Sequence, residues 1–142
     1  MRLTLALVLA LFCGCASENF SVTLFRSNGA SGISERYGVD QNGLGTKTVI
    51  ALADSDSKRR TCAIDPALAA EVRRFVTDSL APLSAIQLHD TSSAISGVQI
   101  VAGGEQREIA WANVDPPELS TPALDSLYHL MLRVETQMAI QE

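Results

Sequence analysis

The sequence has few of the residues on which most catalytic and metal-binding sites depend. Its 142 residues include only two histidines and three cysteines. No pair of histidines has the HExxH spacing, and no pair of cysteines has the spacing of a zinc site. No serine stands in the GxSxG motif that marks the nucleophile of many hydrolases. We therefore predict that the protein is not an enzyme and uses no cofactor or metal.

The shortage of cysteine also excludes a disulfide framework. If Cys13 is lost with a signal sequence and Cys15 is lipid-modified, Cys62 is the only thiol left, and a single thiol cannot form an internal disulfide. We predict that Cys62 is a small, buried apolar residue in a strand. The fold must then be stabilised by one hydrophobic core, for which a chain of this length is sufficient.

Positive charge is scarce. Eleven Lys and Arg residues stand against sixteen Asp and Glu residues, so the formal net charge is −5. Binding to nucleic acid requires a basic surface that neutralises phosphates. The acidic balance therefore predicts that nucleic acid is not the main partner.

Only one long apolar run occurs, at residues 3–12, and it is shorter than the roughly 20 residues that a membrane-spanning helix needs. Arg2 precedes this run, and the small residues Gly14 and Ala16 follow it. A basic start, a short apolar run and a small-residue cleavage zone are typical of a secretory signal. We predict that residues 1–14 are a signal peptide that is removed and that the protein is exported.

The cleavage zone permits two interpretations. The stretch from Phe12 to Cys15 (FCGC) resembles a bacterial lipobox, in which cleavage before a cysteine leaves that cysteine lipid-modified. This resemblance implies lipid attachment at Cys15, a tether over residues 15–19, and anchorage to a membrane of the bacterial cell envelope, on the periplasmic or outer face. Alternatively, cleavage after Ala16 makes Ser17 the new N-terminus.

Alternation of apolar and polar residues predicts the strands. It is present at residues 20–24, 33–39 and 46–52, with glycine-containing turns between these segments. A short strand at 59–64 is a further candidate. Residues 97–102 and 107–114 are predicted to form a second hairpin, in which Trp111 packs against a helix.

Two helices complete the pattern. Asp65 and Pro66 are a favoured N-cap and first helical residue, and this helix is expected to end near Pro82. The second helix begins near residue 121, and Leu130 and Leu132 fall outside its apolar stripe. The order of elements predicts a single α+β domain over residues 20–142, with an antiparallel sheet of about five strands covered on one face by two amphipathic helices.

The turn between the first two strands is the only candidate binding site. The stretch RSNGASGI resembles the RSGGFAG-type loop after the first strand of emfourin-like domains, and the layout of residues 20–134 is similar as well. Ala30 stands where that family often has phenylalanine, and Asn28 replaces a glycine. The resemblance implies a small α+β inhibitor of thermolysin-type zinc metalloproteases. Its partner-binding residues would be Arg26, Ser27, Asn28, Gly29, Ala30, Ser31, Gly32 and Ile33.

Together these features predict an exported, lipid-anchored, non-catalytic binding domain whose partner is a metalloprotease or another envelope protein. The alternative is a cell-envelope accessory lipoprotein that binds another envelope protein and inhibits no protease. A third interpretation is that the loop only reverses the chain, because glycine and asparagine accept the positive φ that tight turns need.

Overall fold

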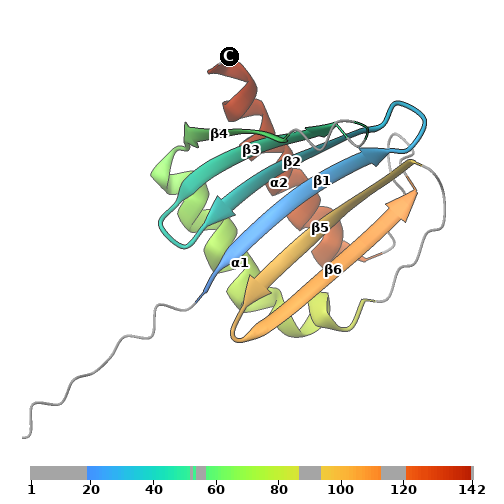
Figure 1. The fold of residues 1–142 in the computed structure, drawn as a ribbon. Coiled ribbons are helices and arrows are strands. Elements are labelled where there is room, and N and C mark those ends of the chain that lie inside the picture. Colours follow the sequence, from blue (N-terminus) through green and yellow to red (C-terminus); the bar gives the residue numbers. More distant parts are fainter. Residues whose placement is uncertain (1–18, 52, 54–56, 87–93, 113–120, 142) are drawn as a thin grey trace, which may run out of the picture.

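Six strands and two helices make up the described part of the chain (Figure 1). The computed structural model describes residues 19–51, 53, 57–86, 94–112 and 121–141. The predicted α+β class and the antiparallel sheet are confirmed. In chain order the elements are β1 (Ser21–Asn28), β2 (Ile33–Asp40), β3 (Leu44–Ala51), β4 (Ser57–Ala63), α1 (Pro66–Ser84), β5 (Ala94–Ala102), β6 (Glu105–Ala112) and α2 (Pro122–Ile140).

The sheet has six strands where the sequence predicted about five. Its order is β4-β3-β2-β1-β5-β6, and every neighbouring pair is antiparallel. The additional strand is β4, which pairs with β3 over its whole length and forms one edge of the sheet. Both helices lie on the far side of the sheet in Figure 1, so no helix of the described residues lies on the near face, which is called the helix-free face below.

The hairpin turns follow from local sequence. Gly103 and Gly104 are the two residues between β5 and β6, with φ of +58° and +79°. Positive φ at both positions is the requirement of the tight hairpin turn whose twist matches that of the strands. Gly43 has φ of +72° in the turn between β2 and β3, where the Asp40 carboxylate accepts hydrogen bonds from the Asn42 and Leu44 amides.

Both helices begin at a proline, as predicted. The Asp65 carboxylate accepts a hydrogen bond from the Ala67 amide at 2.9 Å and caps α1. Pro82 lies inside the last turn of α1, and the helix continues for two residues beyond it and ends at Ser84. A proline near the end of a helix removes one hydrogen bond and need not end the helix where it stands.

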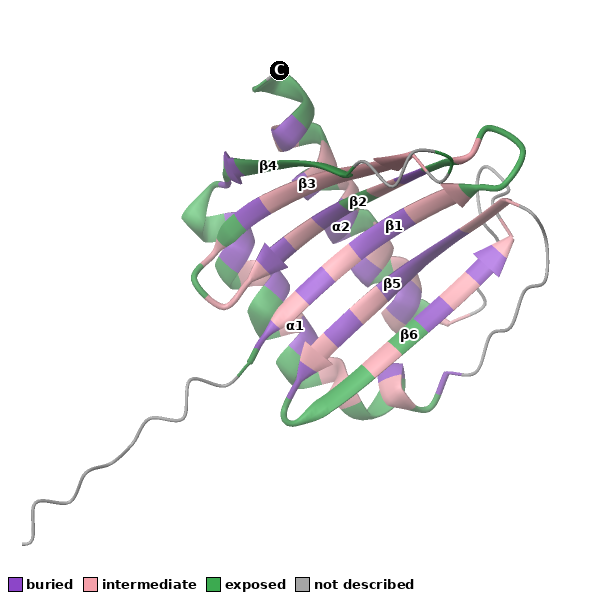
Figure 2. Cartoon of the chain, viewed as in Figure 1, coloured by how far each residue is buried: buried purple, intermediate pink, exposed green. Residues whose placement is uncertain are grey.

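The hydrophobic core lies between the sheet and the two helices, and Figure 2 shows buried and less buried residues alternating along the strands. Cys62 is 2% exposed, which confirms its predicted burial. Trp111 packs edge-to-face on Tyr128 of α2, with ring centroids 5.7 Å apart, as predicted. Leu130 is buried, although the sequence placed it outside the apolar stripe. The reason is that α2 packs against α1 as well as the sheet, which widens its buried face.

The predicted signal peptide (residues 1–14), Cys15 and most of the tether lie outside the described residues. Within the described segments, neither helix is long and apolar enough to cross a membrane.

Candidate functional site

The loop between β1 and β2 is shorter than the eight residues that the sequence singled out. Arg26, Ser27 and Asn28 are the last residues of β1, and Ile33 is the first residue of β2. Only Gly29, Ala30, Ser31 and Gly32 form the turn itself. The structure therefore keeps these eight residues together at one end of a hairpin, but it divides them between two strands and a turn.

Asn28 holds the turn in one conformation. Its side-chain oxygen accepts hydrogen bonds from the Ala30 amide at 3.0 Å and the Ser31 amide at 3.3 Å. The Gly32 amide donates to the Asn28 carbonyl at 2.9 Å, and Gly32 has φ of +66°. Asparagine side chains commonly bond the backbone two residues on in this manner. Three of the four backbone amides of the turn are thus hydrogen-bonded within the hairpin.

The turn presents a small, exposed surface. Asn28, Gly29, Ala30 and Ser31 are all exposed, and Ile33 beside them is 44% exposed. A hollow of about 300 Å³ adjoins them, and it is lined by Ser31 of the turn and by strand residues that include Arg26, Asn28, Ile33 and Glu35. Ile33 is the one large apolar side chain that this end of the hairpin offers to a partner.

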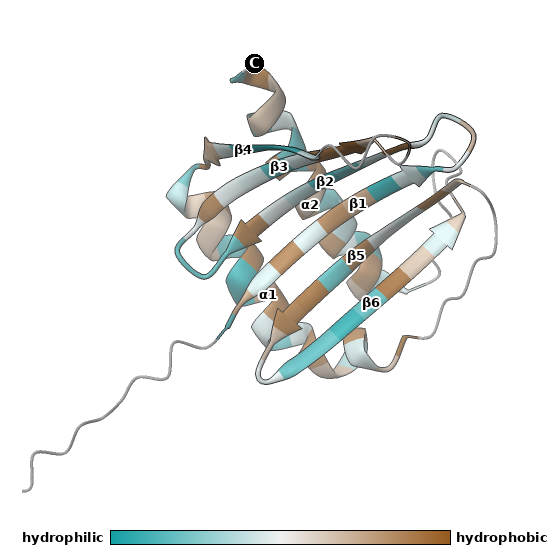
Figure 3. Ribbon diagram, in the orientation of Figure 1, coloured by the Kyte–Doolittle hydropathy of each residue, from teal (hydrophilic) through white to brown (hydrophobic). Residues whose placement is uncertain are grey.

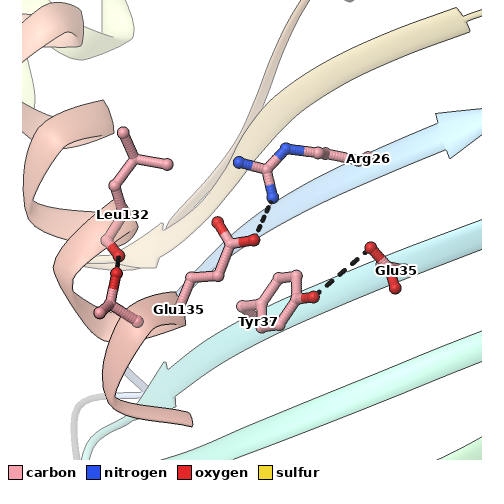
Figure 4. Close-up of polar contacts among 6 residues, drawn as sticks. Arg26, Glu35, Tyr37, Leu132 and Glu135 are labelled. Atoms are coloured by element: carbon pink, nitrogen blue, oxygen red, sulfur yellow. Dashed lines mark hydrogen bonds and ion pairs between the residues drawn. The ribbon is translucent and has the colours of Figure 1, made fainter. Parts of the chain in front are cut away.

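Arg26 does not belong to the exposed surface of the loop. Its guanidinium donates to the Glu135 carboxylate of α2 at 2.6 Å, and both side chains are about one-quarter exposed (Figure 4). Burial disfavours the charged guanidinium, but the hydrogen bond and the charge of Glu135 outweigh this effect and raise the pKa of Arg26. Arg26 is thus an anchor between the sheet and α2.

Tyr37 of β2 lies beside this ion pair (Figure 4). Its hydroxyl donates to the Glu35 carboxylate at 3.4 Å, and the Lys47 ammonium is 5.6 Å from the centre of its ring. Burial raises the pKa of Tyr37 to about 12, and the charges of Glu35 and Glu135 add to this effect. On α2, next to the same ion pair, Thr136 donates to the Leu132 carbonyl at 2.8 Å.

A second hollow, which sequence reasoning missed, lies on the helix-free face of the sheet. Its volume is about 450 Å³, and its lining is formed mainly by side chains of β1, β2, β3 and β4 that point away from the helices. The polar lining includes Ser21, Thr23, Arg36, Thr48 and Arg59, together with one carboxylate, Asp40. The signal was present in the sequence, because hydroxyl residues occupy alternate positions of β1 and β3, which places them on one face.

The described segments contain no group of three or more His, Cys, Asp and Glu side chains that could hold a metal ion. His129 lies 3.6 Å from Asp125, one turn away on α2, and both are largely exposed. Such a pair on a helix surface is an ordinary i,i+4 contact.

No protein-family model matches the chain, and no curated protein matches it either. The emfourin-like resemblance therefore remains a prediction that rests on the residues quoted for it. The case for a binding site rests on the geometry of the hairpin and of the sheet.

Proposed function

We propose that the protein is a non-catalytic binding domain that contacts its partner through the exposed end of the β1–β2 hairpin. The observation that carries this proposal is the pair of hydrogen bonds that the Asn28 side-chain oxygen accepts from the Ala30 and Ser31 amides of the turn. A loop already held in its bound shape loses little conformational entropy when it binds. The narrow residues Gly29, Ala30 and Ser31 allow this loop to enter a cleft.

The first candidate partner is a thermolysin-type metalloprotease, as the emfourin-like resemblance implies. Small side chains at the tip suit a protease cleft, because they let the backbone approach closely. Ala30 supplies no aromatic anchor for a pocket, so Ile33 is the side chain that would provide apolar contact. Arg26 acts in this proposal by fixing the base of the hairpin to α2.

The second candidate is an envelope accessory protein that binds another envelope protein without inhibiting a protease. The absence of an aromatic residue at position 30 favours this alternative, because tight interfaces usually depend on a large buried anchor. A pull-down from solubilised envelope distinguishes the two candidates. A partner that still binds after residues 27–32 are replaced excludes the loop as the contact.

Inhibition is expected to depend on Asn28. The chain from Ser17 onward, which retains the whole core, should slow peptide hydrolysis by a thermolysin-type enzyme. Asn28→Ala removes both hydrogen bonds that order the turn, and we expect the inhibition constant to rise about tenfold, at a loss of roughly 0.5–1.5 kcal/mol per bond. Asn42→Ala, in the turn between β2 and β3, is the matched control and should leave inhibition unchanged. If the native chain leaves hydrolysis unaffected at micromolar concentration, the inhibitor proposal is wrong.

We also propose that the domain is held at the envelope membrane by lipid on Cys15. Between Cys15 and the start of β1 lie five residues, which span at most roughly 17 Å when extended. In the native host, Cys15→Ser should move the protein from the membrane to the soluble fraction, and metabolic labelling with a fatty acid should be lost. A Cys15→Ser protein that still sediments with membranes would show that acylation is not the anchor, and Cys62→Ser serves as the control.

A further inference from the structure

Two arginines, Arg36 and Arg59, lie on the helix-free face of the sheet, within three strands that are rich in positive charge. Strands β2, β3 and β4 contain five Lys and Arg residues and only two acidic residues, a local net charge of +3 in a chain whose net charge is −5. In Figure 3 the hydrophilic colour runs along β4, the edge strand of this group. The strand register places Arg36 and Arg59 on the helix-free face, and it places the other three cations of these strands, Lys47, Lys58 and Arg60, on the face toward the helices, where Arg60 donates to the Gln141 carbonyl.

Two of these cations lie on the same row of side chains, which runs across the strands of the sheet. In the strand register Arg59 pairs with Thr48, and Thr48 pairs with Arg36, so the two arginines flank one threonine. Neighbouring strands are 4.7–4.9 Å apart, so the two arginine backbones are roughly 9–10 Å apart. Long side chains on the same face at this separation can reach a single group that lies above Thr48. All three residues line the 450 Å³ hollow.

The next residue on this row orients Arg36. Phe25 pairs with Arg36 on one side and with Gly97 on the other. Its ring is only 6% exposed although it lies on the helix-free face, because it covers Gly97, where a Cβ atom would be 2.4 Å from the ring. The Arg36 guanidinium stacks 5.9 Å from the centre of the same ring. A cation held over an aromatic face is partly pre-ordered for binding.

Both arginines are exposed, and neither forms an ion pair within the described segments, although the Asp40 carboxylate lines the same hollow. By contrast, Arg26 and Arg133 each form an ion pair there. A guanidinium presents a planar fork of donors that matches the oxygens of an oxyanion. Arg36 and Arg59 therefore offer two such forks to a ligand outside the chain.

We propose that the hollow over Thr48 is a binding site for the phosphate group of a hydroxylated organic phosphate. Two guanidinium forks and the Thr48 hydroxyl supply more donors than one carboxylate accepts, whereas a phosphate has three strong acceptor oxygens. The surrounding hydroxyls of Thr23 and Thr46 suit a ligand that carries hydroxyl groups itself. Hollows of this size hold small molecules, and the polar lining here selects a hydrophilic one.

The site does not conflict with the acidic composition of the chain. Net charge opposes long-range attraction to a large polyanion such as nucleic acid, whereas a single phosphate responds to the charges within about 10 Å at moderate salt. This site lies on the helix-free face, and the ion pair that anchors the hairpin lies on the other face, toward α2. It is thus independent of the function proposed for the loop.

Glycerol 3-phosphate is the soluble probe, with glycerol as its control. We expect amide chemical shifts of Arg36, Thr48 and Arg59 to change on titration with the phosphate ester and not with glycerol. Arg59→Gln, at an exposed position, should raise the dissociation constant by at least about tenfold, because a charged hydrogen-bond pair is lost. Arg74→Gln on α1 removes an equally exposed charge and should change nothing. An equal loss in both variants would overturn the proposal.

Vesicles containing phosphatidylglycerol distinguish a lipid headgroup from a free phosphate ester. If the chain from Ser17 binds these vesicles and Arg59→Gln abolishes this, the headgroup is a source of the ligand. If only glycerol 3-phosphate binds, the source is a soluble ester. The proposed site is wrong if the protein binds neither the vesicles nor glycerol 3-phosphate. It is also wrong if vesicle binding survives Arg59→Gln and glycerol 3-phosphate changes no chemical shifts.

Discussion

Gly97→Ala is expected to destabilise the protein by at least about 3 kcal/mol, a larger effect than overpacking usually causes. A Cβ atom at this position would be 2.4 Å from the Phe25 ring and 2.6 Å from the Ile109 carbonyl oxygen of β6. The ring can move only by leaving its place over the glycine. The carbonyl belongs to the neighbouring strand and cannot move without disturbing the pairing of β5 with β6. Urea denaturation of the native and variant chains measures the difference.

A second buried glycine provides the matched control. At Gly45 a Cβ atom would be 2.5 Å and 2.6 Å from Ile64 side-chain atoms and 2.8 Å from the end of Met138, with no backbone atom among these contacts. Gly45→Ala should therefore cost less, about 1–3 kcal/mol. Its effect should be strongly reduced in an Ile64→Ala background, since the two closest atoms are gone and the remaining contact is with the flexible end of Met138. Gly97→Ala should remain costly in a Phe25→Ala background, and a full rescue there would show that the ring alone is the obstacle.

Raising the pH from 10 to 12 is expected to remove about 2–3 kcal/mol of stability through Tyr37. The pKa of Tyr37 is about 12 in the fold, against an ordinary value of 10, and the side chain is 5% exposed. Above pH 10 the unfolded chain loses this proton and the folded chain keeps it, so the unfolded state is favoured. The stability that the protonated Tyr37 hydroxyl contributes is fully present below pH 10 and is lost as the pH rises through 12.

Tyr37→Phe isolates this effect. The variant should show a flatter dependence of unfolding free energy on pH between 10 and 12, and the phenolate absorbance titration should lose its late step. The chain contains only two tyrosines, which makes the titration simple to interpret. A native chain in which both tyrosines titrate near pH 10 would contradict the burial of Tyr37 beside Glu35 and Glu135.

Much of the fold was predictable because its local rules are strong. Alternation of apolar and polar residues predicted β1, β2 and β3, and Asp65-Pro66 predicted the start of α1. β4 was harder to predict, because five of its residues in succession are exposed. An edge strand of this kind has no apolar alternation to reveal it, since one side of the strand is left open to solvent.

The candidate sites were less predictable because their contacts join residues that are far apart in the sequence. Asn28 was expected in a turn, and the structure shows its side chain accepting two backbone hydrogen bonds there. Arg26 was assigned to the same loop, yet it pairs with Glu135, which is 109 residues away in the sequence. The row of Arg59, Thr48, Arg36 and Phe25 draws on four strands, and no single segment of the chain contains that pattern.

The amino-acid sequence by itself determined the α+β class, the hairpin turns, the start of each helix and the burial of Cys62, because these depend on contacts within a few residues or on simple periodicity. The tertiary structure decided which strand lies beside which, and therefore that Phe25 covers Gly97 and that two arginines share one face. Strand register brings distant residues to within about 5 Å. A one-residue shift would send every such side chain to the opposite face, and that choice is made by the packing of the whole sheet against α1 and α2.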